Sequence, residues 1–87
     1  MNTYLLTFPT TTAAFNAEKT LKDAGYDASV DAVPFELSKT CYGLGVVFHA
    51  ESCDDALRRC NNENVKWKRC WNKNNNEYAL EKEISTD

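Results

Sequence analysis

The sequence predicts an α+β domain of the ferredoxin-like type, with the element order βαββαβ. Four short segments alternate apolar and polar residues with the two-residue period of a strand. Two segments between them repeat apolar residues every three or four positions, which is typical of amphipathic helices. Right-handed crossovers then give a four-stranded antiparallel sheet, in spatial order 4-1-3-2, with two helices on one face. We expect this single domain to span residues 1–72 of the 87, followed by a C-terminal extension at 73–87.

The first half of the chain predicts a strand, a helix and a strand. Residues 4–8 alternate as the first strand, which a proline ends. The threonines at 10–12 are N-cap candidates for a helix that runs to about Ala24. Gly25 stands where a glycine of positive φ commonly closes a helix. Alternation from Tyr26 to Val33 then predicts the second strand.

The second half predicts the same three elements again. Residues 42–49 are the most apolar strand and should be central, with Leu44, Val46 and Phe48 on one face. Glycines at 43 and 45 leave the other face bare, which fits close approach by a backbone or a ligand. Ser52 is expected to cap a second helix. The last strand is expected at residues 65–71.

The C-terminal extension is compatible with two structures. The Glu, Ala, Leu and Lys content of residues 77–84 favours a short helix, which is the structure we expect. Tyr78, Leu80 and Ile84 also fit a two-residue period, so the alternative is a fifth strand that forms a hairpin with the fourth. Residues 85–87 are expected to form a loose end.

Charge and hydropathy narrow the functional classes. The formal net charge is −3 and the sequence pI is about 5.1, which argues against general binding to nucleic acid or anionic membranes. No apolar run approaches the length of a transmembrane helix. The first eight residues lack the basic segment of a signal peptide, so we expect a cytoplasmic protein.

Four cysteines offer the most chemistry in the chain. They stand at positions 41, 53, 60 and 70, without a Cys-x-x-Cys pair and without the ligand spacing of a zinc finger. We therefore expect free thiols, no metal and no cofactor. Cys53 and Cys60 share a helical stripe with Ala56 and Leu57, which indicates core packing for both.

Cys41 is the candidate functional thiol. It follows a polar loop, Gly43 leaves room beside it, and Lys39 is the nearest cation in the sequence. Cys70, expected in an edge strand, is its main competitor for reactivity. The other interpretation of Cys41 is a small, half-buried packing residue. The negative ends of both helices would lie near Cys41 and disfavour a thiolate, which favours a non-enzymatic protein over an enzyme with a cysteine nucleophile.

Short motifs carry a resemblance to a known family. They are the opening Tyr-Leu-Leu-Thr-Phe-Pro-Thr at 4–10, Ala-Glu-Lys at 17–19, Val-Pro at 33–34, and Ser38-x-x-Cys41 leading into a glycine. Over about residues 3 to 71, the chain resembles a family of small selenium/sulfur carrier-like proteins. The resemblance implies that Cys41 holds sulfur or selenium as a persulfide or its selenium analogue. In that family a glycine usually follows the cysteine directly, whereas here Tyr42 intervenes before Gly43.

Two other functions remain open. The first is RNA binding, because the RNA-recognition motif shares the βαββαβ order and basic residues lie beside Trp67 and Trp71. The acidic net charge makes this the weaker alternative. The second is a non-catalytic interaction or regulatory module. We also expect either a homodimer or coverage of the open sheet face by the C-terminal segment. If the chain is a carrier, we also expect a partner protein that donates or accepts sulfur or selenium.

Overall fold

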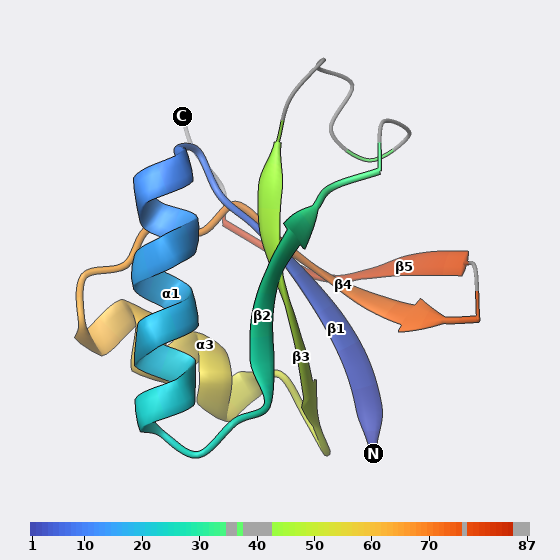
Figure 1. The fold of residues 1–87 in the computed structure, drawn as a ribbon. Coiled ribbons are helices and arrows are strands. Elements are labelled where there is room, and N and C mark those ends of the chain that lie inside the picture. Colours follow the sequence, from blue (N-terminus) through green and yellow to red (C-terminus); the bar gives the residue numbers. More distant parts are fainter. Residues whose placement is uncertain (35–36, 38–42, 76, 85–87) are drawn as a thin grey trace.

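The computed structural model describes residues 1–34, 37, 43–75 and 77–84. Within these residues, two helices pack on one face of a five-stranded antiparallel sheet (Figure 1), whose strand order is β2-β3-β1-β4-β5. The elements are β1 (Asn2–Thr7), α1 (Thr11–Asp23), β2 (Ala28–Ala32), β3 (Leu44–Ala50), α3 (Asp54–Asn62), β4 (Arg69–Asn74) and β5 (Glu77–Glu83). The α+β class and the relative order of the first four strands are confirmed. The four-stranded sheet is corrected to five strands.

The fifth strand shows that the helix predicted at 77–84 is wrong and that the hairpin alternative is right. β5 pairs antiparallel with β4, and Leu80 lies opposite Trp71. Asn75 turns the chain between them with a φ of 58°, a left-handed conformation that asparagine tolerates well. Backbone pairing with the open edge of β4 therefore outweighs the weak helix propensity of the segment.

The helix ends follow the local sequence. The Thr10 side chain accepts a hydrogen bond from the Ala13 amide at 3.1 Å, so one of the threonines at 10–12 does cap α1. Gly25 follows α1 with a φ of 94°. At α3 the expected cap is displaced by one residue. Cys53 occupies the N-cap position, while the Ser52 hydroxyl accepts the Asp54 amide at 3.2 Å.

The core lies between the sheet and the helices. Leu6 from the central strand β1 and Val46 and Phe48 from the interior strand β3 are fully buried and face the helices, as predicted for β3. The small residues Ala14 and Ala17 let α1 lie close to the sheet, and both are fully buried. This packing of apolar side chains supplies most of the driving force for folding.

The fourth strand begins later than the alternation indicates. Val65 and Trp67 lie in the connection before β4, yet both are buried in the core. The Trp67 Nε1–H donates a hydrogen bond to Asn61 Oδ1 at 3.1 Å, which satisfies the polar end of the ring. The alternation of Val65 and Trp67 with polar residues therefore reflects burial of their side chains and not pairing in the sheet.

The opposite face of the sheet carries no helix, and we call it the free face (Figure 1). Side chains alternate along a strand and cross-strand partners share a face, so Leu5, Val47 and Trp71 lie there together. Leu80, the partner of Trp71, belongs to the same face and is 48% exposed. The described part of the C-terminal segment extends the sheet at its edge, so it does not cover this face as one of our alternatives expected.

Candidate functional site

The predicted carrier thiol, Cys41, lies outside the described residues, as do its predicted supporting residues Ser38 and Lys39. The structure does place both flanks of this segment. The Val33 amide donates a hydrogen bond to the Gly43 carbonyl at 3.0 Å. The chain therefore leaves β2 and enters β3 at neighbouring points, at the same end of this pair of strands.

The structure explains why a glycine stands at position 45, the second of the two glycines that follow Cys41. A Cβ at this position would lie 2.7 Å from the carbonyl oxygen of Leu6 and 3.0 Å from side-chain atoms of Leu5 and Val33. The close approach predicted from the sequence is therefore made by the protein's own backbone and side chains. Leu5 packs over the glycine on the free face and is only 2% exposed, although no helix covers it.

The three cysteines within the described residues are all buried. Cys53 is 4% exposed, and Cys60 and Cys70 are fully buried in the core cluster. Burial raises the pKa of the Cys60 thiol to about 11 and also raises the pKa values of Cys53 and Cys70. These thiols are mostly protonated at neutral pH and shielded from bulky reagents.

Cys70 is not the accessible competitor that the sequence suggested. That expectation placed it in an edge strand, but β4 lies between β1 and β5. Cys70 is paired with Leu6 on one side and with Lys82 on the other, and its side chain faces the helices. Its predicted supporting role beside Cys41 is not tested, since Cys41 lies outside the described residues.

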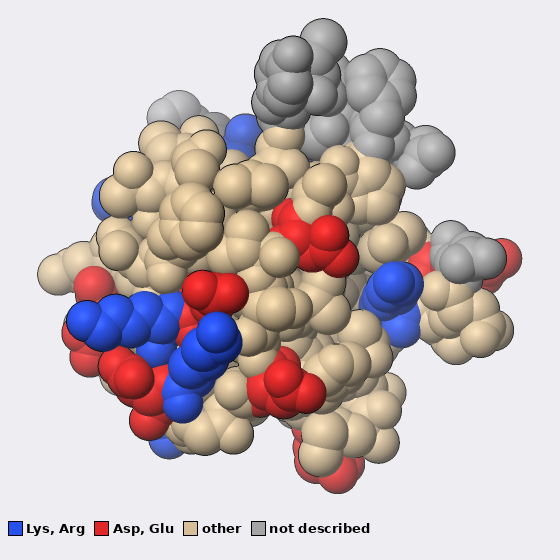
Figure 2. Space-filling view, in the orientation of Figure 1, with Lys and Arg blue, Asp and Glu red and all other residues tan. Residues whose placement is uncertain are grey.

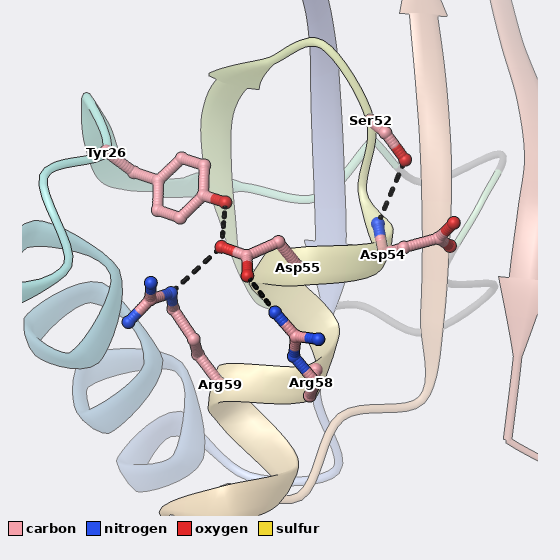
Figure 3. Close-up of polar contacts among 6 residues, drawn as sticks. All are labelled: Tyr26, Ser52, Asp54, Asp55, Arg58 and Arg59. Atoms are coloured by element: carbon pink, nitrogen blue, oxygen red, sulfur yellow. Dashed lines mark hydrogen bonds and ion pairs between the residues drawn. The ribbon is translucent and has the colours of Figure 1, made fainter.

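A polar network at the start of α3 was not anticipated from the sequence (Figure 3). The Tyr26 hydroxyl donates a hydrogen bond to the Asp55 carboxylate at 2.5 Å, and the guanidinium groups of Arg58 and Arg59 donate at 2.5 and 2.9 Å. Hydrogen bonds from Tyr26 and the two arginines hold the pKa of Asp55 well below its usual range. The network joins the segment between α1 and β2 to α3, which indicates a structural role.

The sole histidine lies at the far end of β3 from Gly43. His49 Nδ1 is 3.0 Å from the Thr3 hydroxyl oxygen. It lines an open depression of about 640 Å³ that also includes Tyr26, Ser52 and Asp55. β3 has seven residues, so its two ends are separated by roughly 20 Å at 3.3 Å per residue. This depression therefore lies far from the point where the chain enters β3.

Other classes of site find little support in the described part of the chain. Among residues 1–34, 37, 43–75 and 77–84, no group of three or more His, Cys, Asp and Glu residues is arranged to hold a metal ion. None of the helices there is long and apolar enough to cross a membrane.

The basic residues that suggested RNA binding are partly neutralised. Arg58 and Arg59 contact Asp55, and Arg69 forms an ion pair with Glu83. Figure 2 shows Lys and Arg side chains lying among Asp and Glu over the helices, without a continuous basic surface on the face in view. A surface of mixed charge attracts a phosphate backbone weakly.

Comparison with known proteins gives one match. A family model described as "Putative Se/S carrier protein-like" matches residues 3–72. Curated proteins and solved structures gave no significant match. The matched region runs from β1 through most of β4 and includes all four cysteines.

Proposed function

The chain belongs to the Se/S carrier-like family, and we propose that it carries sulfur or selenium as a persulfide-type adduct on Cys41. The match covers residues 3–72, from β1 through most of β4, so family membership does not depend on one short motif. We further propose that the protein works in the cytoplasm, where thiols are kept reduced and available for transfer.

The burial of the other three thiols is the observation that supports Cys41. A carrier sulfur must reach both a donor and an acceptor, and its adduct adds a second large atom beside the sulfur. Cys53, Cys60 and Cys70 are enclosed in the core, where an additional atom would overpack their surroundings. This objection applies to each of the three cysteines that the structure describes, which supports Cys41 as the carrier.

The transfer that we propose is a thiol–disulfide type of exchange. The Cys41 thiolate attacks the terminal sulfur of a donor persulfide, R–S–SH. A new S–S bond forms to Cys41, the S–S bond of the donor breaks, and the donor leaves as its thiolate. The product is Cys41–S–SH. With a selenium donor, R–S–SeH, the same displacement gives Cys41–S–SeH. No external oxidant or reductant is needed in either case.

Intact-mass and peptide mass spectrometry of the protein purified from its own cells test this proposal. We expect a mass increase of one sulfur or one selenium atom that maps to Cys41 and disappears after treatment with a thiol reductant. A Cys41→Ser variant purified in parallel should lack the adduct. An adduct on Cys53, Cys60 or Cys70, or its persistence in the variant, would contradict the proposal.

A second candidate function is a dimeric interaction module, with or without carrier activity. We propose a homodimer in which the free faces of two copies pack together, because Val47, Trp71 and Leu80 are apolar and partly or largely exposed there. The outer edge of β2 is a poor alternative. The amide of Val30 is bound by the Glu18 carboxylate at 2.9 Å. The amide of Ala32 is bound by the Asp31 carboxylate at 2.8 Å, so both amides are already occupied.

Light scattering of two matched variants tests the dimer. Leu80 on β5 and Phe15 on α1 are similarly exposed, at 48% and 52%, but Phe15 belongs to the helical layer. Leu80→Glu should give a monomer, because it places a charge in the interface, whereas Phe15→Glu should leave the dimer intact. A monomeric wild-type protein, or equal effects of both substitutions, would contradict the proposal.

A further inference from the structure

The free face of the sheet carries a line of polar side chains at the end where β1 begins. His49 of β3 pairs with Thr3 of β1, and Thr3 also pairs with Lys73 of β4. Lys73 pairs in turn with Tyr78 of β5. Cross-strand partners share a face, and each of the four stands two positions along its strand from an apolar residue of the free face. We call these four residues the polar row.

The polar row is rich in hydrogen-bond donors. The Lys73 ammonium and the Tyr78 hydroxyl can both donate at neutral pH. His49 Nδ1 lies 3.0 Å from the Thr3 hydroxyl oxygen. If the hydroxyl donates to Nδ1, the neutral ring keeps its proton on Nε2, and if Nδ1 donates, the hydroxyl keeps its own proton. In either direction of this hydrogen bond, the pair retains one donor for a ligand.

The charge around Lys73 is positive, although the chain as a whole carries −3. None of the ion pairs among the described residues involves Lys73. The next free-face residues along the same three strands are apolar, namely Leu5, Trp71 and Leu80. The acidic residues Asp27 and Glu51 line the depression beside His49, on the β2–β3 side of the row. An anion is therefore favoured at the Lys73 end of the row.

Lys73 is also partly ordered before any ligand arrives. It is half-buried, whereas Lys66 and Lys68 in the connection before β4 are exposed. A lysine becomes buried along its apolar stem while the ammonium stays at the surface. Its flanking partners Thr3 and Tyr78 are half-buried as well. Side chains that are already restricted lose less conformational freedom on binding than fully exposed ones.

We propose that the polar row binds the phosphate group of a small organic phosphate. A phosphate monoester offers three oxygens and a charge of about −1.5 to −2 at pH 7. It can therefore accept hydrogen bonds from Thr3, Lys73 and Tyr78, whose strands lie about 4.8 Å apart. A carboxylate, with two oxygens and a single charge, matches fewer of these donors. The row lies roughly 20 Å from Gly43 along β3, so the proposal goes beyond the carrier function and is independent of it.

An NMR titration of the full-length, ¹⁵N-labelled protein with phenyl phosphate tests the proposal. At about pH 7 and constant ionic strength, the backbone amides of Thr3, Lys73 and Tyr78 should shift saturably with a single Kd. Amides at the opposite end of the same strands should not follow this curve. Phenol is the neutral control and should cause no such shifts, because it lacks the phosphate. Benzoate, which carries a carboxylate on the same ring, should bind several-fold more weakly.

Matched lysine variants make the result specific. Lys73→Ala should weaken the binding of phenyl phosphate about fivefold, whereas Lys73→Arg, which keeps the charge, should retain most of it. Lys68→Ala removes an exposed lysine just before β4, at the opposite end of the sheet, and should leave the Kd unchanged. The dispersion of each spectrum shows that the variant is folded.

Three outcomes would overturn the proposal. They are the absence of saturable shifts in the wild-type protein, equal losses in Lys73→Ala and Lys68→Ala, and binding of benzoate as tight as that of phenyl phosphate. Cys41 is unaltered in all of these proteins, and no sulfur or selenium adduct is measured. Failure of phosphate binding therefore leaves the carrier proposal untouched, and failure of the carrier proposal leaves the phosphate site untouched.

Discussion

Alkylation of the native protein should discriminate sharply among the four cysteines. The perturbation is a limiting amount of iodoacetamide at about pH 8, where only the thiolate reacts at an appreciable rate. Burial raises the pKa of Cys60 from an ordinary 9.0 to about 11. The thiolate fraction of Cys60 is then about a hundredfold smaller than that of an unshifted thiol.

Shielding acts in the same direction as the pKa. Cys60 and Cys70 are fully buried, so iodoacetamide reaches them only when the surrounding structure opens. We therefore expect Cys41 to be labelled first and Cys60 to be labelled more than a hundredfold more slowly. Cys53 and Cys70 should also lag behind Cys41, since burial raises the pKa of each.

Peptide mapping with two proteases gives the labelling rate of each thiol. Trypsin alone leaves Cys41 and Cys53 on the same peptide, 40–58, so a second cleavage after Glu51 is needed to separate them. Labelling in urea is the control, because unfolding should bring the four rates close together. If Cys53 or Cys60 reacts faster than Cys41 in the native protein, both the burial argument and the carrier proposal lose their basis.

Two further predictions concern stability. Gly45→Ala should destabilise the fold by about 1–3 kcal/mol, because the new Cβ meets the Leu6 carbonyl oxygen at 2.7 Å, and unchanged urea unfolding would contradict this packing. Asp55 has a lower pKa in the folded protein than in the unfolded chain, so its ionised form stabilises the fold. This contribution is fully present above the usual aspartate pKa of about 3.9 and is lost as the pH falls below that value. Asp55→Asn should flatten this acid dependence in thermal unfolding measured at several pH values, and an unchanged profile would show that the network with Tyr26, Arg58 and Arg59 contributes nothing.

The strand order was predictable because two independent rules agree. Alternation located the strands, and the handedness of crossovers fixed their order around β1 and β3. The burial of Val46 and Phe48 on the helix side also followed directly from the period of β3. These features depend on residue alternation and on the handedness of crossovers, and both rules can be applied to a single sequence.

The fifth strand was harder to predict because its residues favour a helix, whereas pairing with β4 requires a strand. Glu, Ala, Leu and Lys favour a helix, but the segment follows three asparagines that allow a tight turn back along β4. Asn75 adopts the left-handed conformation of such a turn. The asparagine run was therefore the signal for a hairpin. This signal leads to a hairpin only where the neighbouring strand has an unpaired edge, and the tertiary structure alone shows that edge.

The burial of Cys70 could not be predicted for a similar reason. The sequence correctly assigns Cys53 to a buried position on α3, but it treats Cys70 as a residue of an exposed edge. β5 changes that assignment, because its pairing with β4 places Lys82 beside Cys70. Lys82 in turn reaches Asp54 at the start of α3. Contacts of this kind arise from three elements together, and no local pattern reports them.

The same strand therefore bears on the carrier proposal. By pairing with β4, β5 turns an expected edge strand into an interior one and helps to enclose Cys70, which removes the main competitor of Cys41. β5 also contacts the start of α3, because Lys82 Nζ lies 3.7 Å from Asp54 Oδ1. A thiol enclosed in the core is poorly placed to exchange sulfur with another protein, so the pairing of β5 supports the proposal that Cys70 takes no part in the transfer.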